Sequence, residues 1–425
     1  MRGAALRRAI RAGGAVLLAA AALASCTDTS RREQPPSSTD RVGVAPSASP
    51  SGPSPQIPTP GLSSEPSPAP EEVYAPLSGP IRMDDGRLLT VTPQGWIVDL
   101  ASGEIRATYP SGEDTFVTGP AFLRAGPIEA TVGFDAPAGT MALTRDGVTV
   151  EGERVSLERR EVTVRSAGAR LVGTFTIPPG PGPHPAVVVV HGAGPEVRSQ
   201  DQLWADVFAA RGVAALTYDK RGAGDSGGTY PGGVATESAL LSLAGDAATW
   251  VRFLAKQPEI DRDAIGLEGA SQAGWIIPVV ALRATVAWTV ILMGPTVSVE
   301  ESDRYGDFSG DGEFLPSEPM RDILREVRGL APFGFDPAPF LRRMGVPGLW
   351  IYGRVDRVVP TPLCVERLRR LRPDAEVRIV QAGHQLLESK QGLLSEVADS
   401  KRFAPGLFSS IDRWVAEHVP GATRI

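Results

Sequence analysis

The sequence predicts an α/β fold with a mostly parallel, doubly wound sheet, preceded by a smaller β-rich region. Two observations carry this prediction. From about residue 161 to residue 425, short apolar runs typical of buried strands alternate with helical patterns. Between residues 77 and 160, short strand patterns are separated by turn residues, and no helical period occurs. We therefore expect a β-rich domain over 77–160 and an α/β domain over 161–425.

The first 25 residues have the pattern of a signal peptide rather than of a folded segment. Four arginines precede an apolar run at residues 15–23, which is too short to span a bilayer as a mature helix. Cys26 follows a Leu-Ala-Ser sequence, which resembles a bacterial lipobox and implies lipidation of Cys26. We therefore expect a lipid-anchored protein on the extracytoplasmic side of the cell membrane. The alternative is an ordinary secreted protein with an incidental cysteine.

Residues 26–76 are rich in Pro, Ser and Thr and hold almost no large apolar side chains, so they predict a disordered tether. Without the four arginines of residues 1–25, the 43 basic residues of the chain fall to 39, against 49 acidic residues. This negative balance argues against nucleic acid as a partner and against a basic membrane-binding face. Contact with the membrane is therefore expected through the lipid at Cys26 alone.

A serine stands in the motif Gly-Ala-Ser-Gln-Ala-Gly at residues 269–274, between an apolar strand pattern and a helical pattern. A serine at the apex of a strand, a tight turn and a helix is the context of a nucleophile elbow. The helix N-terminus then faces the serine oxygen and favours negative charge there. Ala273 departs from the common G-x-S-x-G pattern. Ser271 is therefore the candidate nucleophile, and the alternative is an ordinary serine in a turn rich in small residues.

A serine hydroxyl becomes a useful nucleophile when a base takes its proton. Among the four histidines, His384 is the best candidate, because it lies in a loop after a predicted strand and downstream of Ser271. Asp356 lies in the loop after another predicted strand, where its carboxylate can orient the imidazole. The alternative is that Asp356 caps the next segment and that His384 is an ordinary loop residue.

From about residue 161 onward, the chain resembles the α/β-hydrolase superfamily, in which nucleophile, acid and base follow one another in this order. Its motifs resemble those of bacterial serine esterases close to dienelactone hydrolase-like and acyl thioester hydrolase-like proteins. The resemblance implies an oxyanion hole formed by the N–H groups of Ala193 and Gln272, and a structural role for His191. It also implies a bracing role for the turn at 219–222, to which we assign no chemistry. The matching stretches are residues 191–195, 218–226, 269–275, 353–360 and 383–384.

Residues 294–347 separate two predicted strands, at a point where the superfamily often carries a small helical cap. Within them, residues 307–318 match the EF-hand calcium loop, although a serine replaces the usual Asp or Asn at position 3. We expect no cofactor for catalysis. For residues 307–318 we slightly favour a structural Ca²⁺ site, and the alternative is an acidic surface loop without a metal. The candidate calcium ligands are Asp307, Ser309, Asp311, Glu313 (through its backbone carbonyl) and Glu318.

These observations predict an extracytoplasmic serine hydrolase, and most specifically a carboxylesterase that cleaves small or medium acyl esters. One alternative is a peptidase or acyl-peptidase of the same fold, in which the β-rich region screens peptides. Another, from a different class, is a binding lipoprotein on a catalytically dead hydrolase scaffold.

Overall fold

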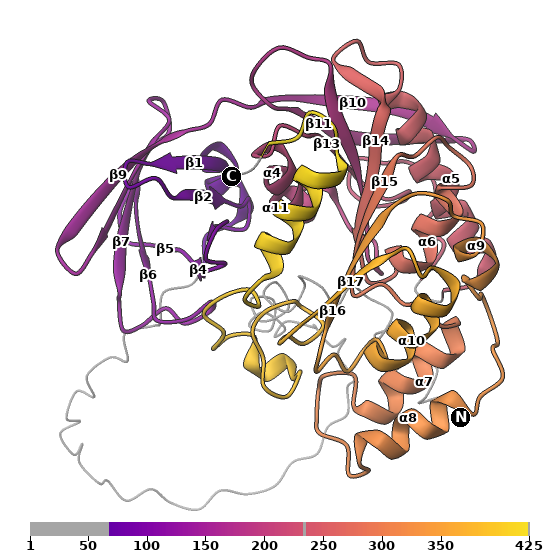
Figure 1. Ribbon diagram of the computed structural model, residues 1–425. Helices are drawn as coiled ribbons and strands as arrows, with labels where there is room; N and C mark the ends of the chain where they lie inside the picture. The colour runs from indigo at the N-terminus through magenta and orange to yellow at the C-terminus, as the bar shows by residue number, and fades with distance from the viewer. Residues whose placement is uncertain (1–67, 233–234, 424–425) are drawn as a thin grey trace, which may run out of the picture.

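Two β-sheets form the framework of the molecule (Figure 1). The computed structural model describes residues 68–232 and 235–423. The predicted signal peptide, Cys26 and most of the predicted tether lie outside the described residues. None of the helices in the two described stretches combines the length and the apolar composition that a membrane span requires.

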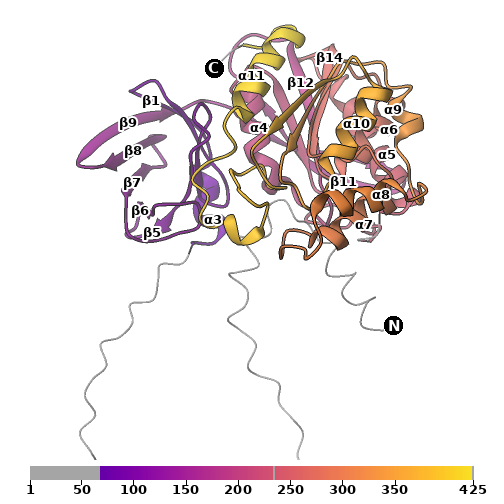
Figure 2. The ribbon, with the colours of Figure 1, turned by 60° about the horizontal axis from the view of Figure 1, so that its bottom comes forward.

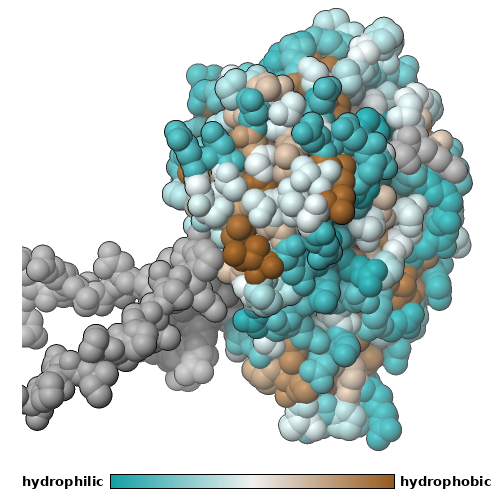
Figure 3. Space-filling view, turned by 90° about the vertical axis from the view of Figure 1, so that its left-hand side faces the viewer, coloured by the Kyte–Doolittle hydropathy of each residue, from teal (hydrophilic) through white to brown (hydrophobic). Residues whose placement is uncertain are grey.

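The first sheet is antiparallel, with its nine strands in the order β4-β3-β2-β1-β9-β8-β7-β6-β5. Short turns join most of its strands, and a longer loop joins β6 to β7. Between β8 and β9, Asp146 and Gly147 both have positive φ, as a two-residue hairpin turn of type I′ requires. Tyr74, Phe116 and Phe134 pack together on its inner face. On its outer side, hydrophilic residues surround near-neutral residues and a few hydrophobic patches (Figure 3). The elements are α3 (Glu71–Tyr74), η1 (Ala75–Leu77), β1 (Gly79–Met83), β2 (Leu88–Val91), β3 (Trp96–Asp99), β4 (Ile105–Ala107), β5 (Tyr109–Pro110), β6 (Thr115–Thr118), β7 (Ala130–Asp135), β8 (Thr140–Arg145) and β9 (Val148–Arg154).

The second sheet has eight strands in the order β10-β11-β13-β12-β14-β15-β16-β17. The hairpin of β10 and β11 joins β13 in antiparallel fashion, and the strands from β13 to β17 are mutually parallel. This is the α/β-hydrolase fold, so the predicted fold class, with its preceding β-rich region, is confirmed. The strands are β10 (Glu158–Ser166), β11 (Ala169–Ile177), β12 (His184–Val190), β13 (Ala214–Tyr218), β14 (Ile260–Ala270), β15 (Trp288–Leu292), β16 (Gly348–Gly353) and β17 (Glu376–Val380).

Helices cover both faces of the second sheet, because its central strands are apolar on both sides. In β12, Val187 and Val189 pack into one hydrophobic cluster, while Val188 and Val190 pack into the other. The face next to the β-rich sheet carries α4 and α11, and the opposite face carries α5, α6 and α10 (Figures 1 and 2). These elements are η2 (Arg198–Asp201), α4 (Gln202–Ala209), α5 (Glu237–Leu254), α6 (Ala273–Val280), α10 (Thr361–Leu371), η3 (Leu394–Glu396) and α11 (Leu407–His418).

A small helical cap lies between β15 and β16 and consists of α7 (Val299–Ser309), α8 (Met320–Arg328) and α9 (Ala338–Leu341). Helix α7 begins at a capping box, in which Glu301 accepts a 2.7 Å hydrogen bond from the backbone N–H of Ser298. It ends at Gly310, whose left-handed conformation (φ 85°) closes the last turn.

A shared hydrophobic cluster and several hydrogen bonds, among them the following two sets, join the β-rich sheet to the rest of the molecule. Asp206 of α4 is fully buried and accepts hydrogen bonds from Thr90 of β2 (2.8 Å) and Arg159 of β10 (2.7 Å). The segment 398–403, which precedes α11, provides the second set. Its carbonyl groups accept hydrogen bonds from the backbone of β4 at 3.1 Å and from the loop after β6 at 2.7 Å. Residues late in the chain thus complete hydrogen bonds of the first sheet.

Candidate active site

Ser271 lies at the turn between β14 and α6 with a positive φ of 55°. This conformation is uncommon for a residue with a Cβ. The turn depends on close approach of the backbone. A Cβ on Gly269 would lie 2.4 Å from a carbonyl oxygen of β12, and one on Gly274 would lie 2.4 Å from the loop after β15. Ala273 is buried beside Gly269, so its methyl group occupies space that the absent side chain of Gly269 leaves open.

Ser271, His384 and Asp356 form a chain of hydrogen-bonded side chains. His384 Nε2 lies 3.0 Å from Ser271 Oγ, and His384 Nδ1 lies 2.9 Å from Asp356 Oδ2. The other carboxylate oxygen of Asp356 accepts the backbone N–H groups of Val358 (2.8 Å) and Val359 (2.9 Å), which fixes its orientation. The three residues follow the carboxyl ends of β14, β17 and β16, which brings them to one edge of the sheet. The structure therefore brings the predicted nucleophile, base and acid together.

His384 is buried, and its surroundings favour the charged imidazole. Burial acts against the charge, but the Asp356 carboxylate outweighs it through its charge and its hydrogen bond. Asp311 of the cap adds a further contribution of the same sign, and the net effect raises the pKa of His384 above 6.5. The arrangement can therefore hold a proton on His384 when Ser271 releases one.

The loop after β12 offers one backbone N–H group to the site. The Gly192 N–H donates to the Glu196 carboxylate, and the Gly194 N–H donates to Tyr230 Oη at 3.0 Å. Between them, the Ala193 N–H has no acceptor within the described stretches of the chain. The Gln272 N–H, at the start of α6, has no acceptor there either, as expected for the first N–H groups of a helix. The two N–H groups predicted to form the oxyanion hole are thus free of backbone and side-chain partners in the part of the chain that is described.

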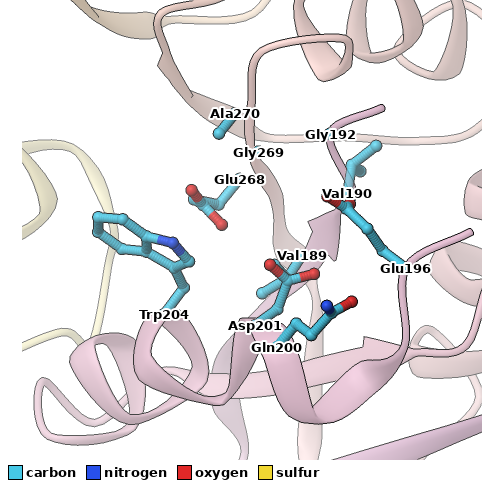
Figure 4. A pocket seen from close by; sticks show the side chains of 10 residues that line it. All are labelled: Val189, Val190, Gly192, Glu196, Gln200, Asp201, Trp204, Glu268, Gly269 and Ala270. Carbon is cyan, nitrogen blue, oxygen red and sulfur yellow. The ribbon is translucent and has the colours of Figure 1, made fainter. Parts of the chain in front are cut away.

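A buried cluster of ionisable groups lies behind this loop, around a cavity of about 20 Å³ (Figure 4). This volume holds about one water molecule. Glu268 lines the cavity with no hydrogen-bond partner among the described residues, and burial raises its pKa well above 4.5. Burial also raises the pKa of Glu196 to about 7. His191 Nδ1 lies 2.6 Å from Asp201 Oδ2, so its imidazole faces this cluster.

The cap contacts the loop of the predicted acid directly. Tyr305 of α7 donates a 2.7 Å hydrogen bond to the backbone carbonyl of Asp356, and Ser309 donates to the carbonyl of Arg357. The Gly312 carbonyl of the cap accepts a 2.8 Å hydrogen bond from Leu394, in the segment that follows His384. Tyr305 and Tyr230 were not identified from the sequence, because no local motif marks them.

The predicted calcium loop does not have a calcium-binding arrangement in this structure. Asp307 and Ser309 still belong to α7, and the Ser309 hydroxyl is used by Arg357. Within 68–232 and 235–423, no three His, Cys, Asp or Glu side chains are grouped so that they could hold a metal ion. The residues in this conformation therefore do not fit a bound Ca²⁺ ion, and calcium binding stays a prediction.

Comparison with protein families identifies one match. Residues 167–314 match the S15 family of X-Pro dipeptidyl-peptidases. This stretch includes Ser271 and the loop with Ala193, but neither Asp356 nor His384. The match therefore concerns the first part of the α/β domain and the beginning of the cap.

Two curated relatives have detectable sequence similarity. Esterase EstD of Thermotoga maritima is 26% identical over 227 residues, which cover 47% of this chain and 52% of the relative. Polyketide transferase claH of Penicillium crustosum is 27% identical over 223 residues, covering 50% of this chain and 63% of the relative. The chain thus spans between about half and two thirds of the length of these relatives. Among solved structures, the Pyrococcus furiosus esterase Pf2001 aligns with a TM-score of 0.45 and 18% identity, over 62% of this chain and 92% of that chain.

Proposed function

We propose that this chain, which belongs to the α/β-hydrolase superfamily, is a serine hydrolase and specifically a carboxylesterase for small or medium acyl esters. The observation that carries the proposal is the connected arrangement of Ser271, His384 and Asp356, with distances of 3.0 and 2.9 Å. Such a connection between nucleophile, base and orienting acid is the signature of covalent catalysis by serine. The similarity to the Thermotoga esterase EstD supports the ester as substrate.

The proposed reaction proceeds through an acyl-enzyme. Ser271 Oγ attacks the ester carbonyl carbon while His384 Nε2 accepts its proton, and the Asp356 carboxylate stabilises the imidazolium. The N–H groups of Ala193 and Gln272 donate to the oxyanion that forms. The C–O bond to the alcohol then breaks as His384 returns the proton to the leaving oxygen. Water, deprotonated by His384, attacks the acyl-enzyme and releases the carboxylic acid and Ser271.

A fluorophosphonate probe tests the nucleophile. We expect stoichiometric labelling of the wild-type chain and no labelling of Ser271→Ala, because the probe requires an activated serine. A matched control is Ser389→Ala, since Ser389 is a buried serine whose hydroxyl is held by a carboxylate, that of Glu396, instead of by a histidine. Absence of labelling in the wild type would favour the alternative of a binding protein on a dead scaffold.

A second candidate function is a peptidase, and the match of residues 167–314 to the X-Pro dipeptidyl-peptidase family favours it. Hydrolysis of p-nitrophenyl esters of graded chain length, compared with X-Pro p-nitroanilides, separates the two candidates. For the esterase we expect kcat/KM to peak at short or medium acyl chains and the anilides to react slowly. A higher kcat/KM for the anilides would make the peptidase the better assignment.

We further propose that the enzyme acts outside the cytoplasm, held to the membrane by a lipid on Cys26. The proposal rests on the sequence pattern around Cys26, which lies outside the described residues. Metabolic labelling of cells with an alkyne fatty acid should label the wild-type chain and not Cys26→Ser. Labelling that persists in Cys26→Ser would overturn the anchor. Cys364→Ser is the matched control, because this second cysteine is fully buried.

A further inference from the structure

Lys220 is a buried charge without an assigned role, although the turn that contains it was recognised in the sequence. Its ammonium group donates to the carbonyl oxygens of Gly192 and Gly194, the latter at 2.8 Å, and only 1% of the residue is exposed. The charges of Glu196 and Asp201 favour its protonated form, but within residues 68–232 and 235–423 no carboxylate lies close enough to form an ion pair with it. A buried ammonium is costly unless it is hydrogen-bonded. The hydrogen bonds of the Lys220 ammonium group are therefore made to the loop after β12.

Because of the geometry of the peptide unit, these contacts determine the direction in which the Ala193 N–H group points. A peptide unit is planar and trans, so its C=O and its N–H point in opposite directions. Because Lys220 holds the Gly192 carbonyl, the Ala193 N–H points away from Lys220. Because the Gly194 N–H is held by Tyr230 Oη, the Ala193 carbonyl points away from Tyr230. Both peptide units that flank Ala193 are thus fixed from outside the loop.

We propose that Lys220 and Tyr230 are positioning residues for the oxyanion hole, which keep the Ala193 N–H directed at the oxyanion formed on Ser271-bound substrate. The inference rests on the proposed serine hydrolase function. Lys220 and Tyr230 also contact each other, since the ammonium lies 5.7 Å from the centre of the Tyr230 ring. They form one support, and neither residue needs to touch the substrate.

The variant Lys220→Met tests the proposal, because methionine fills a similar volume and donates no hydrogen bond. Loss of one oxyanion donor costs about 10²- to 10³-fold in kcat, so we expect a fall in kcat of about 10²-fold with KM little changed. The Ki of a trifluoromethyl ketone, which forms a tetrahedral adduct with serine, should rise by the factor by which kcat/KM falls. Rates are expressed per active site, titrated to completion with a fluorophosphonate.

Arg221→Met is the matched control. Arg221 belongs to the same turn, but its guanidinium pairs with Asp246 of α5 at 2.5 Å and does not contact the loop after β12. We expect this variant to lower the melting temperature while kcat per active site and Ki stay at the wild-type values. The control separates damage to the turn from misdirection of the Ala193 N–H.

The outcomes distinguish this proposal from the function on which it rests. If wild-type Ser271 does not react with the fluorophosphonate, the serine hydrolase itself is wrong. If the wild type reacts but Lys220→Met keeps its kcat per active site and its Ki, the positioning role is wrong and the function stands. If Lys220→Met does not fold, the same kcat and Ki measurements on Tyr230→Phe test the proposal, because this change removes only the acceptor of the Gly194 N–H. A reduced kcat with an unchanged KM supports the proposal, and unchanged kcat and Ki overturn it.

Discussion

The Tyr305 hydroxyl donates a 2.7 Å hydrogen bond to the backbone carbonyl of Asp356, so a cap helix holds the loop of the proposed catalytic acid. Tyr305 is only 3% exposed, and the bond joins two elements that lie 51 residues apart. The cap is therefore part of the support of the active site.

Tyr305→Phe should lower activity through the position of Asp356. The change leaves the buried carbonyl of Asp356 without its donor, which costs about 1–3 kcal/mol. If Asp356 moves as a result and part of this cost appears in the activation free energy, we expect kcat to fall by about tenfold. Steady-state kinetics with a p-nitrophenyl ester measures the effect. Tyr74→Phe is the matched control, since Tyr74 makes the same kind of 2.7 Å bond to the Thr108 carbonyl in the β-rich sheet. Equal kcat values in the two variants would contradict the link.

The dependence of activity on pH should reflect the raised pKa of His384. The neutral imidazole is the active base, so kcat/KM should rise with pH through an apparent pKa above 6.5. Asp356→Asn removes the main cause of the shift, so we expect the acidic limb to move to lower pH and kcat to fall by about 10⁴-fold. Asp311→Asn should move the limb in the same direction by less. An acidic limb that stays in place in both variants would contradict the assignment.

The same ion pair has a predictable effect on stability. Because the pKa of His384 is higher in the folded chain than its ordinary value of 6.5, the contribution of the pair is fully present below pH 6.5. It is lost as the pH rises through the raised value. The unfolding free energy of the wild type should thus fall relative to His384→Gln across this range, as denaturant titrations at several pH values can measure.

Asp206→Ala should destabilise the junction between the two sheets. Asp206 is completely buried, and its removal leaves Thr90 and Arg159 without their acceptor. Breaking a buried pair in this way costs about 3–5 kcal/mol, which chemical denaturation would detect. Arg325→Gln breaks an exposed pair with Asp322 and should change the free energy of unfolding by less than about 1 kcal/mol. Similar losses in the two variants would contradict a special role for Asp206.

Calcium binding by residues 307–318 can be tested by melting the protein at increasing calcium concentrations. Because the candidate ligands do not converge, binding must be coupled to a rearrangement of the loop. We therefore expect any rise in melting temperature only at about 10⁻⁴–10⁻³ M calcium, the range of weak extracellular sites. The rise should be absent in Glu318→Ala and present in Glu313→Ala, since Glu313 was expected to bind through its backbone. No rise at any concentration would overturn the prediction.

The sheet and the triad were predictable because their signals are local. The valine run of β12 is typical of a strand buried on both faces, and Ser271 stands in a short motif typical of a turn between a strand and a helix. Asp356 and His384 each lie in a loop a few residues after a strand, and parallel strands bring such loops to the same edge of the sheet. A further local signal is Thr236, whose side chain caps the start of α5 at Glu237.

The supporting contacts could not be predicted, because they join distant segments without any periodic pattern. Lys220 reaches a carbonyl 28 residues away, and neither partner shows its role in its own surroundings. The calcium pattern illustrates the opposite case. The spacing of residues 307–318 fits a calcium-binding loop, yet α7 continues through Ser309 and ends at Gly310. The first two candidate ligands, Asp307 and Ser309, therefore lie in a helix and not in a loop.

The hydrogen bonds between the β-rich sheet and residues 398–403 have a consequence for the order of folding. Ile105 and Phe122 find their acceptors in Lys401 and Ser400, almost 300 residues further along the chain. A chain that emerges from the ribosome N-terminus first cannot form these bonds until residues 400 and 401 have been synthesised. The β-rich sheet should therefore reach its full protection against hydrogen exchange late, together with the segment that follows His384.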